Sequence, residues 1–311
     1  MMIDRRGFTK QLCLAMIASR ARAGSGDRKQ RISIGAQTNT WGVPITPYEH
    51  LLDIVDTLAR IGYEGFETNY KALSEHADKP AECRRDFEAR HCPLIAAHNG
   101  VRFDDKDKIN AEIEGQKKIA ATTAKMGATY MIVSGRRLPH VDGKLDVDAA
   151  HRKMEALNRL GRTCREEGLK LCYHNHVQEF EDDPSEISLF FKETDPAVVA
   201  LNYDVGNANG VQPDAGTFSE EHFRRIAIYH IKDVKRPEHA TSGPRTGENG
   251  NIPMDLGKGQ INLKGVVAPL LDSDWKGWLT VEREGQYPHP AEHPEALLRQ
   301  CRDYLRQITG V

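Results

Sequence analysis

The chain has 311 residues, of which 39% are hydrophobic and 28% are charged, a composition typical of a folded globular protein rather than a disordered or fibrous one. Its 43 Lys and Arg nearly balance its 45 Asp and Glu, and the resulting net charge of -2 excludes a strongly basic nucleic-acid-binding protein. The sequence contains no apolar run near the roughly 20 residues that a membrane span needs. The six cysteines form no C-x-x-C pair, which excludes a zinc ribbon and a thioredoxin-type motif.

Residues 1–30 are predicted to be a targeting segment followed by a linker. The Arg5-Arg6 pair, with Phe8 and Lys10 shortly after it, resembles a twin-arginine export signal. A short apolar stretch and the small-x-small sequence at 21–23 follow, as in a cleavable signal. We therefore expect export to the periplasm, or a cytoplasmic location if the signal is not functional. The folded domain is expected to begin at residue 31.

From residue 31 onward, short apolar segments alternate with amphipathic ones. Period-two or continuous apolar patterns predict eight strands, at residues 32–37, 63–68, 94–98, 129–134, 169–174, 198–204, 226–232 and 277–282. Helical spacing of apolar residues, or a capping residue, predicts helices at residues 48–61, 82–90, 113–126, 148–167, 185–192, 219–225, 262–271 and 294–308. A Gly-, Pro- and His-rich insertion at 235–259 is expected either to cover the site or to lack regular structure.

Eight strand–helix units in one chain predict an α/β protein, a single-domain TIM (β/α)8 barrel spanning residues 31–311. The main competing fold is an open doubly wound sheet. Its usual nucleotide-binding motifs, G-x-G-x-x-G and G-x-x-x-x-G-K-[ST], do not follow the first predicted strand. The barrel is therefore the favoured prediction.

Polar and ionisable side chains follow the predicted strands where a TIM barrel carries its active site, at the carboxyl ends. The fifth to eighth strands end with His174, Asp204, His230 and Glu282, respectively, or lead directly into them. Burying carboxylates together is costly unless a cation neutralises them. Carboxylate oxygens with imidazole nitrogens suit Mn²⁺, Co²⁺, Mg²⁺ or Zn²⁺, so the pattern indicates a divalent metal site.

The ordered motifs resemble those of the sugar phosphate isomerase/epimerase superfamily, the xylose isomerase-like TIM barrels. The motifs are Tyr173-His174-Asn175-His176 with Glu179, Asp204-Val205-Gly206-Asn207, His230-Ile231-Lys232-Asp233, Leu256 to Ile261, and Val281-Glu282. The superfamily includes inosose dehydratases, ketose 3-epimerases and endonuclease IV. The resemblance covers essentially the whole chain from residue 31.

The resemblance implies one divalent metal ion held by Glu179, Asp204, His230 and Glu282, with Mn²⁺ favoured over Co²⁺, Mg²⁺ or Zn²⁺. Many relatives place the first glutamate within the fifth strand, where this chain has His174. Because His174 and His176 share one face of that strand, either is an alternative ligand.

The function implied by the resemblance is a metal-dependent sugar or cyclitol isomerase or epimerase. It would abstract a proton beside a metal-chelated carbonyl and form an enediolate. A lyase or dehydratase that eliminates a group from a keto-sugar or 3-keto-glycoside through the same first step is the alternative, and a non-catalytic sugar-binding barrel is the remote one. The predicted acid/base residues are Glu179, Glu282 and His176. The predicted substrate-binding residues are Trp41, Glu67, His98, His174, Asn207 and Lys232.

The expected partner is a small-molecule sugar or keto-sugar, with no nucleic acid and no membrane. Many relatives carry His three residues after the sixth-strand aspartate, where this chain has Asn207. The change removes a ligand of the zinc cluster of endonuclease IV and so disfavours DNA cleavage. Related barrels often dimerise, so a homo-oligomer is compatible with the resemblance.

Overall fold

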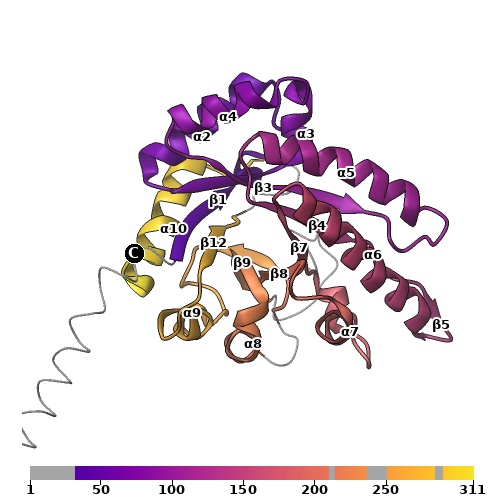
Figure 1. The fold of residues 1–311 in the computed structure, drawn as a ribbon. Helices are drawn as coiled ribbons and strands as arrows, with labels where there is room; N and C mark the ends of the chain where they lie inside the picture. The colour runs from indigo at the N-terminus through magenta and orange to yellow at the C-terminus, as the bar shows by residue number, and fades with distance from the viewer. Residues whose placement is uncertain (1–31, 210–213, 237–250, 284–289) are drawn as a thin grey trace, which may run out of the picture.

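A closed barrel of eight parallel strands forms the centre of the molecule in the computed structural model (Figure 1). The structure describes residues 32–209, 214–236, 251–283 and 290–311. The predicted targeting segment and linker, residues 1–30, lie outside the described residues. Around the barrel the strands follow the order β1-β12-β9-β8-β7-β4-β3-β2, which closes by pairing β1 with both β2 and β12.

The strands of the barrel alternate with helices along the chain. The barrel strands are β1 (Ile32–Gln37), β2 (Gly65–Asn69), β3 (Leu94–Val101), β4 (Tyr130–Gly135), β7 (Lys170–His174), β8 (Val199–Asp204), β9 (Ile226–Ile231) and β12 (Gly277–Val281). The main helices are α2 (Tyr48–Ile61), α4 (Pro80–Ala89), α5 (Ile109–Lys125), α6 (Val147–Glu166), α7 (Glu186–Glu193), α8 (Ala215–His222), α9 (Leu263–Leu271) and α10 (Pro294–Thr309). They surround the strands in Figure 1. The predicted single TIM barrel is confirmed.

Several short elements were not predicted. They are η2 (Thr38–Trp41), α3 (Tyr70–Leu73), η3 (Ser74–His76), η4 (Val177–Phe180), η5 (Phe223–Arg225) and the antiparallel pair β5 (His140–Val141) and β6 (Lys144–Leu145). A second antiparallel pair joins β10 (Asp233–Lys235) to β11 (Ile252–Met254). Both strands of that pair lie at the two ends of the predicted insertion, so part of it has regular structure. Residues 237–250 lie outside the described part.

The helices pack on the barrel through the apolar stripe that their spacing predicts. In α2, Leu51, Val55 and Leu58 are fully buried and recur at intervals of three or four residues. Gly62 ends α2 in the left-handed conformation, with φ of 99°, and its N–H bonds the carbonyls of Leu58 and Ala59. The local signals for the helix and for its end therefore agree with the packing.

Strand alternation divides the barrel into an outer and an inner set of side chains. Tyr173, Tyr203 and Tyr229 belong to the core between strands and helices. The adjacent positions Cys172 and Ile228 belong to a separate apolar cluster of buried residues. Because alternate residues of a strand share a face, His174 and His230, two positions beyond Cys172 and Ile228, also face the barrel interior. Those residues are polar, so an apolar layer lies beneath a polar layer toward the carboxyl ends.

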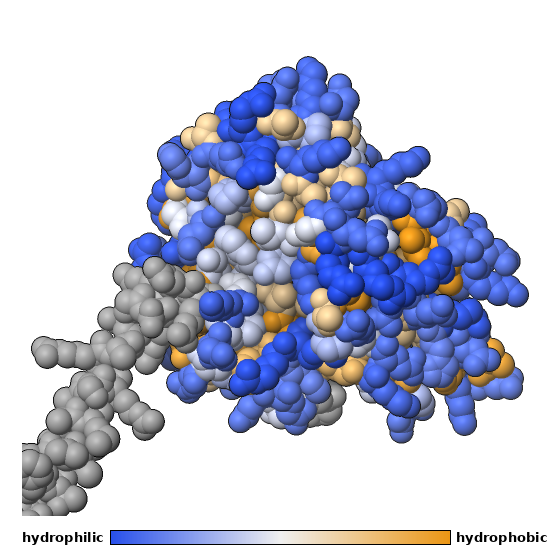
Figure 2. All heavy atoms as spheres, viewed as in Figure 1, coloured by the Kyte–Doolittle hydropathy of each residue, from blue (hydrophilic) through white to orange (hydrophobic). Residues whose placement is uncertain are grey.

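The outer surface in the view of Figure 2 is mostly hydrophilic at the periphery, where the helices lie, and paler in the middle. Within the described ranges, every helix is too short or too polar to cross a bilayer.

Two glycines give a test of the inner packing. A methyl group at Gly35, in β1, would overlap Ile95 Cδ1 and lie 3.2 Å from the Gly65 carbonyl oxygen. We expect Gly35→Ala to lower the free energy of unfolding by about 1–3 kcal/mol. The exposed helical Gly115 has nothing within 4 Å of such a methyl group. Gly115→Ala should therefore raise the free energy by up to about 1 kcal/mol. Urea unfolding measures the free energy of unfolding of both variants, and equal changes in the two would contradict the packing argument.

Candidate metal centre

Three metal-binding side chains converge at the carboxyl ends of neighbouring strands. His174 ends β7, Asp204 ends β8 and His230 lies in β9, and one ligand atom from each lies within 4.8 Å of the other two. All three side chains are buried. The predicted ligands Asp204 and His230 are thus brought together, and the third member of the triad is His174, the alternative to Glu179.

The ring of His174 is held by an asparagine one strand away. Its Nδ1 lies 2.6 Å from Asn202 Oδ1, while Asn202 Nδ2 donates to the Ile228 carbonyl. An amide oxygen only accepts, so Nδ1 of His174 carries the proton. The lone pair is then on Nε2, which lies 4.0 Å from Asp204 Oδ2. This is the tautomer that a metal-binding histidine needs.

Asp204 is fixed by a local network that leaves one oxygen facing the site. Its Oδ1 accepts the Asn207 backbone N–H at 2.7 Å, and its backbone N–H donates to Asn175 Oδ1. The Asn207 amide donates to the Asn175 carbonyl and lies 3.5 Å from His174 Nε2. Asn207, a predicted substrate-binding residue, therefore supports the loop that orients Asp204.

His230 lies between two buried carboxylates. Its Nε2 is 2.7 Å from Glu67 Oε2, in β2 on the other side of the barrel, and its Nδ1 is 2.6 Å from Glu282 Oε2. The same Nδ1 is 3.9 Å from Asp204 Oδ2. Glu67 thus orients the ring from behind, and Nδ1 faces the site. Glu282, a predicted ligand that directly follows β12, lies beside the triad.

Lys232 brings a positive charge to the carboxylate oxygens of Asp204 and Glu282. Its Nζ is 3.0 Å from Asp204 Oδ2 and 3.4 Å from Glu282 Oε2, and the side chain is largely buried. The ammonium thus lies within reach of a ligand bound at these carboxylates.

Burial and neighbouring charge shift the pKa values of these groups. Burial lowers the pKa of His174 well below its usual value, which favours the neutral ring. Burial raises the pKa of Asp204. Burial alone would raise the pKa of Glu282, but Lys232 and His230 outweigh it and hold that pKa well below the usual range. Burial alone would lower the pKa of His230, but the carboxylates of Glu67 and Glu282 raise it well above its usual value.

The donor set fits a divalent cation. Asp204 Oδ2 and Glu282 Oε2 are fully buried, and their near neighbours are the Lys232 ammonium and His230 Nδ1. Together with His174 Nε2, and with His230 Nδ1 once a cation has displaced its proton, they offer two oxygens and two nitrogens. Such a mixed set suits Mn²⁺, Co²⁺ or Zn²⁺.

Two further histidines flank the triad. The ring centroids of His98 and His174 are 4.8 Å apart, and His98 Nδ1 lies 3.4 Å from Glu67 Oε1. The centroids of His176 and His174 are 5.0 Å apart, and burial lowers the pKa of His176. Both lie beside the triad, and their predicted roles toward a substrate stay predictions. Trp41 lies in η2 and lines a different pocket, together with residues of α10.

Glu179 lies in another environment. It is fully buried, its Oε2 accepts the His176 backbone N–H at 2.7 Å, and its Oε1 accepts from the Tyr173 hydroxyl. Tyr173 points outward from β7, opposite to His174. The structure therefore does not group Glu179 with the triad, and its predicted role as a ligand stays a prediction.

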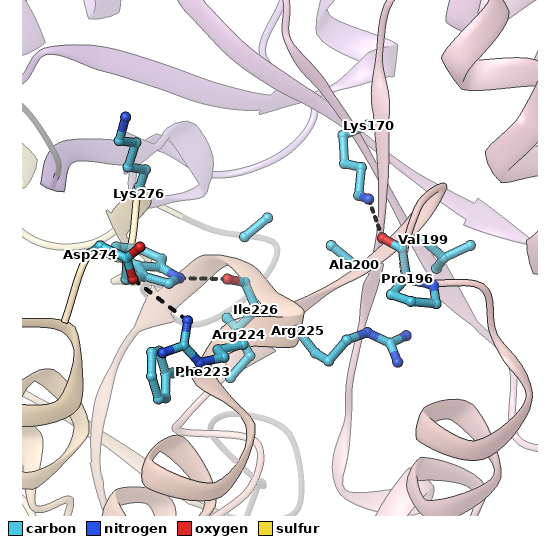
Figure 3. A pocket seen from close by; sticks show the side chains of 12 residues that line it. Lys170, Pro196, Val199, Ala200, Phe223, Arg224, Arg225, Ile226, Asp274 and Lys276 are labelled. Carbon is cyan, nitrogen blue, oxygen red and sulfur yellow. Dashed lines mark hydrogen bonds and ion pairs between the residues drawn. The ribbon is translucent and has the colours of Figure 1, made fainter.

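Figure 3 shows a pocket of about 330 Å³ at the opposite end of the barrel, near the first residues of β8 and β9. Four cationic side chains line it, but Lys170 bonds the Pro196 carbonyl and Arg224 pairs with Asp274. Arg225 also bonds Thr194 Oγ1, so three of the four cationic side chains are engaged with the protein, and no triad residue lines the pocket.

Sequence reasoning missed two asparagines. Asn202 holds His174, and Asn39 Nδ2 donates to Glu282 Oε1 at 3.3 Å. Asn202 lies two positions before Asp204, so alternation along the strand contained the signal that both face inward. Nothing local in the sequence indicates that Asn39 contacts a residue 243 positions away.

Removing the Asn202 carbonyl tests the orientation of His174. We expect Asn202→Ala to weaken the binding of Co²⁺ or Zn²⁺ by about 10- to 100-fold, the usual effect of losing a partner that orients a metal ligand. Asn158→Ala is the matched control, because the Asn158 side chain likewise makes two hydrogen bonds, both with backbone groups, but lies on the outer helix α6. Competition titration measures the metal affinity of both variants. Wild-type affinity in Asn202→Ala would contradict the assignment of Asn202 as the residue that orients His174.

Comparisons with known proteins agree with this fold. An inosose dehydratase of Geobacillus kaustophilus is 26% identical over 271 residues, which is 82% of this chain and 86% of that protein. A D-allulose 3-epimerase of a Methylomonas species has a similar fold, with a TM-score of 0.70, 15% identity, and coverage of 90% of this chain and 98% of that one. A structure of IOLI protein with a bound zinc atom has a TM-score of 0.67 at 14% identity, with 89% and 98% covered. The pattern of the xylose isomerase-like TIM barrel family matches residues 55–308, so the chain belongs to that family.

Proposed function

We propose that this protein is a divalent-metal-dependent lyase that eliminates water beside the carbonyl group of a keto-sugar or keto-cyclitol. The proposal is carried by one observation: Nε2 of His174, Oδ2 of Asp204 and Nδ1 of His230 converge in a buried site next to Glu282 and Lys232. His174, Asp204, His230 and Glu282 would hold the ion, with Mn²⁺, Co²⁺ and Zn²⁺ as the candidates. When bound, the ion supplies a Lewis acid that makes the C–H beside a carbonyl more acidic.

The residues around the triad can move the protons that elimination requires. The reaction removes a proton from the carbon beside the carbonyl and gives a proton to the hydroxyl that leaves from the next carbon. His176, whose ring packs against His174, is the candidate base. The Lys232 ammonium is the candidate donor to the leaving oxygen. His98, whose Nδ1 lies 3.4 Å from Glu67 Oε1, is the candidate to orient the substrate hydroxyls.

The names of the relatives support elimination. Two of the relatives described as inosose dehydratases align over 82% and 83% of this chain, and dehydration is an elimination of water. Isomerisation or epimerisation is the second candidate, and a specific observation favours it. Glu282 follows β12 and His176 follows β7, so two acid/base groups enter the site from separate parts of the barrel. One of them can remove a proton and the other return it on a different face.

Metal content is the first test of this proposal. Mass spectrometry should find about one divalent ion per wild-type chain, and the Asp204→Ala/Glu282→Ala double variant should lose it. The control variant is Asp105→Asn. It removes a surface carboxylate, which pairs with Lys108 in the wild-type chain, and leaves the site untouched. No bound metal after reconstitution would contradict the proposal and favour a non-catalytic sugar-binding barrel.

The reaction itself is tested with inosose in D2O, followed by proton NMR and ultraviolet absorbance. Elimination predicts loss of water and a new conjugated ketone absorbance. Deuterium incorporation without loss of water would instead indicate the isomerase or epimerase. Wild-type protein that carries metal but exchanges no proton of inosose, a keto-sugar panel or 3-keto-glycosides would contradict both.

A further inference from the structure

A second buried cluster of charged groups lies outside the barrel wall, behind the metal centre. Lys153 of α6, Tyr173 of β7, Glu179 of η4 and Glu186 of α7 are each at most 3% exposed. We call these four residues the Lys153 cluster. Lys153 Nζ is 2.5 Å from Glu186 Oε1 and 4.0 Å from Glu179 Oε1. The Tyr173 hydroxyl is 2.6 Å from Glu186 Oε1 and 2.9 Å from Glu179 Oε1.

Burying one ammonium and two carboxylates is expensive, and apolar residues of similar volume often fill such a space at lower cost. Stability alone therefore gives a weak reason for the Lys153 cluster. Packing around it is also tight, because a methyl group at Gly135 would overlap the end of Lys153 and lie 3.1 Å from the Tyr173 hydroxyl. The cluster therefore has little freedom to rearrange.

The cluster connects to the metal centre through Glu179. While Oε1 of Glu179 belongs to the cluster, its Oε2 accepts the backbone N–H of His176 at 2.7 Å. The same carboxylate caps η4, the turn that directly follows His176. Gln178 adds to the anchorage, because its Nε2 donates to Glu179 Oε1 and to the Gly135 carbonyl. The chain segment just beyond His174 is thus anchored to the Lys153 cluster.

Strand alternation explains why one short segment serves both clusters. His174 points into the barrel and Tyr173 out of it, since adjacent residues of β7 face opposite sides. After β7 ends, the turn carries Glu179 back to the outer side and leaves the His176 ring beside His174. Glu179 is thereby separated from the triad while it still contacts the backbone of a residue at the site.

We infer that Glu179 is a positioning residue rather than a metal ligand: it couples the Lys153 cluster to the backbone of His176 and so holds that imidazole against the metal centre. The inference rests on the proposed function for the role of His176 in proton transfer, but the coupling itself is a property of this chain. The inference gives a role to the four residues of the Lys153 cluster, none of which takes part in the proposed reaction.

Glu179→Gln tests the inference, because glutamine keeps the size of the side chain but has a single acceptor oxygen. It cannot accept from both Tyr173 and the His176 N–H. We expect this variant to bind Co²⁺ with unchanged stoichiometry and an unchanged visible spectrum, whereas loss of a ligand would alter both. The imidazole ¹⁵N signals of His176, assigned by comparison with His176→Gln, should shift. Turnover of inosose should fall by about 100-fold in kcat with little change in KM, as expected for a misplaced group.

Two further variants complete the design. Glu88→Gln is the matched control, because it removes an exposed carboxylate that pairs with Arg84 on α4, and it should leave the spectrum and the His176 signals unchanged. Glu186→Gln perturbs the cluster without touching His176, and it carries the test if Glu179→Gln does not fold. It should shift the His176 signals with metal binding retained.

The outcomes separate this inference from the proposed function. Loss of metal or an altered Co²⁺ spectrum in Glu179→Gln would show that Glu179 is a ligand and would overturn the inference. Unmoved His176 signals in the folded variants would overturn it as well. If the wild-type chain binds no metal, the proposed function fails, while the His176 signals of the metal-free protein still decide the inference.

Discussion

Burying Glu67, Asp204 and Glu282 at one end of a closed barrel costs free energy that hydrogen bonds and nearby positive charge must offset. Within the described residues, that charge comes from His230 and Lys232, which contact all three carboxylates between them. The same carboxylates, with His174 and His230, form the candidate metal centre, where a cation would take the place of the His230 proton. Much of the local structure serves to keep these groups aimed at one point, from the Asn202–His174 contact to the loop that fixes Asp204.

The barrel wall separates two polar clusters whose charges would otherwise interact. The inner cluster carries the ligand-type atoms, and the Lys153 cluster lies on the other side of β7 between the barrel and the helices α6 and α7. Tyr173 and His174 are adjacent in sequence but belong to opposite sides. A rigid outer cluster can therefore orient the chain that leaves β7 without adding charge to the candidate metal centre.

The same site geometry suits both candidate reactions, because elimination and isomerisation begin with removal of a proton beside a carbonyl. They differ in what happens next: a hydroxyl leaves, or a proton returns at another position. An ammonium near the carboxylates, in Lys232, favours a leaving oxygen that needs a proton. The outcome then depends on how substrate hydroxyls lie relative to Lys232 and His176, which is a matter of side-chain placement and not of the family fold.

Periodicity and spacing in the sequence were sufficient for the order of strands and helices, because amphipathic helices and buried parallel strands leave strong local patterns. The same patterns put Asp204, His230 and Glu282 at strand ends, where a barrel must bring them together. The direction of Glu179 could not be found this way. It lies five residues past His174, beyond the strand, where alternation no longer applies and the path of the turn decides which side it faces. The contacts of Asn39 with Glu282 and of Glu67 with His230 also depend on closure of the barrel, since they join residues far apart in the chain.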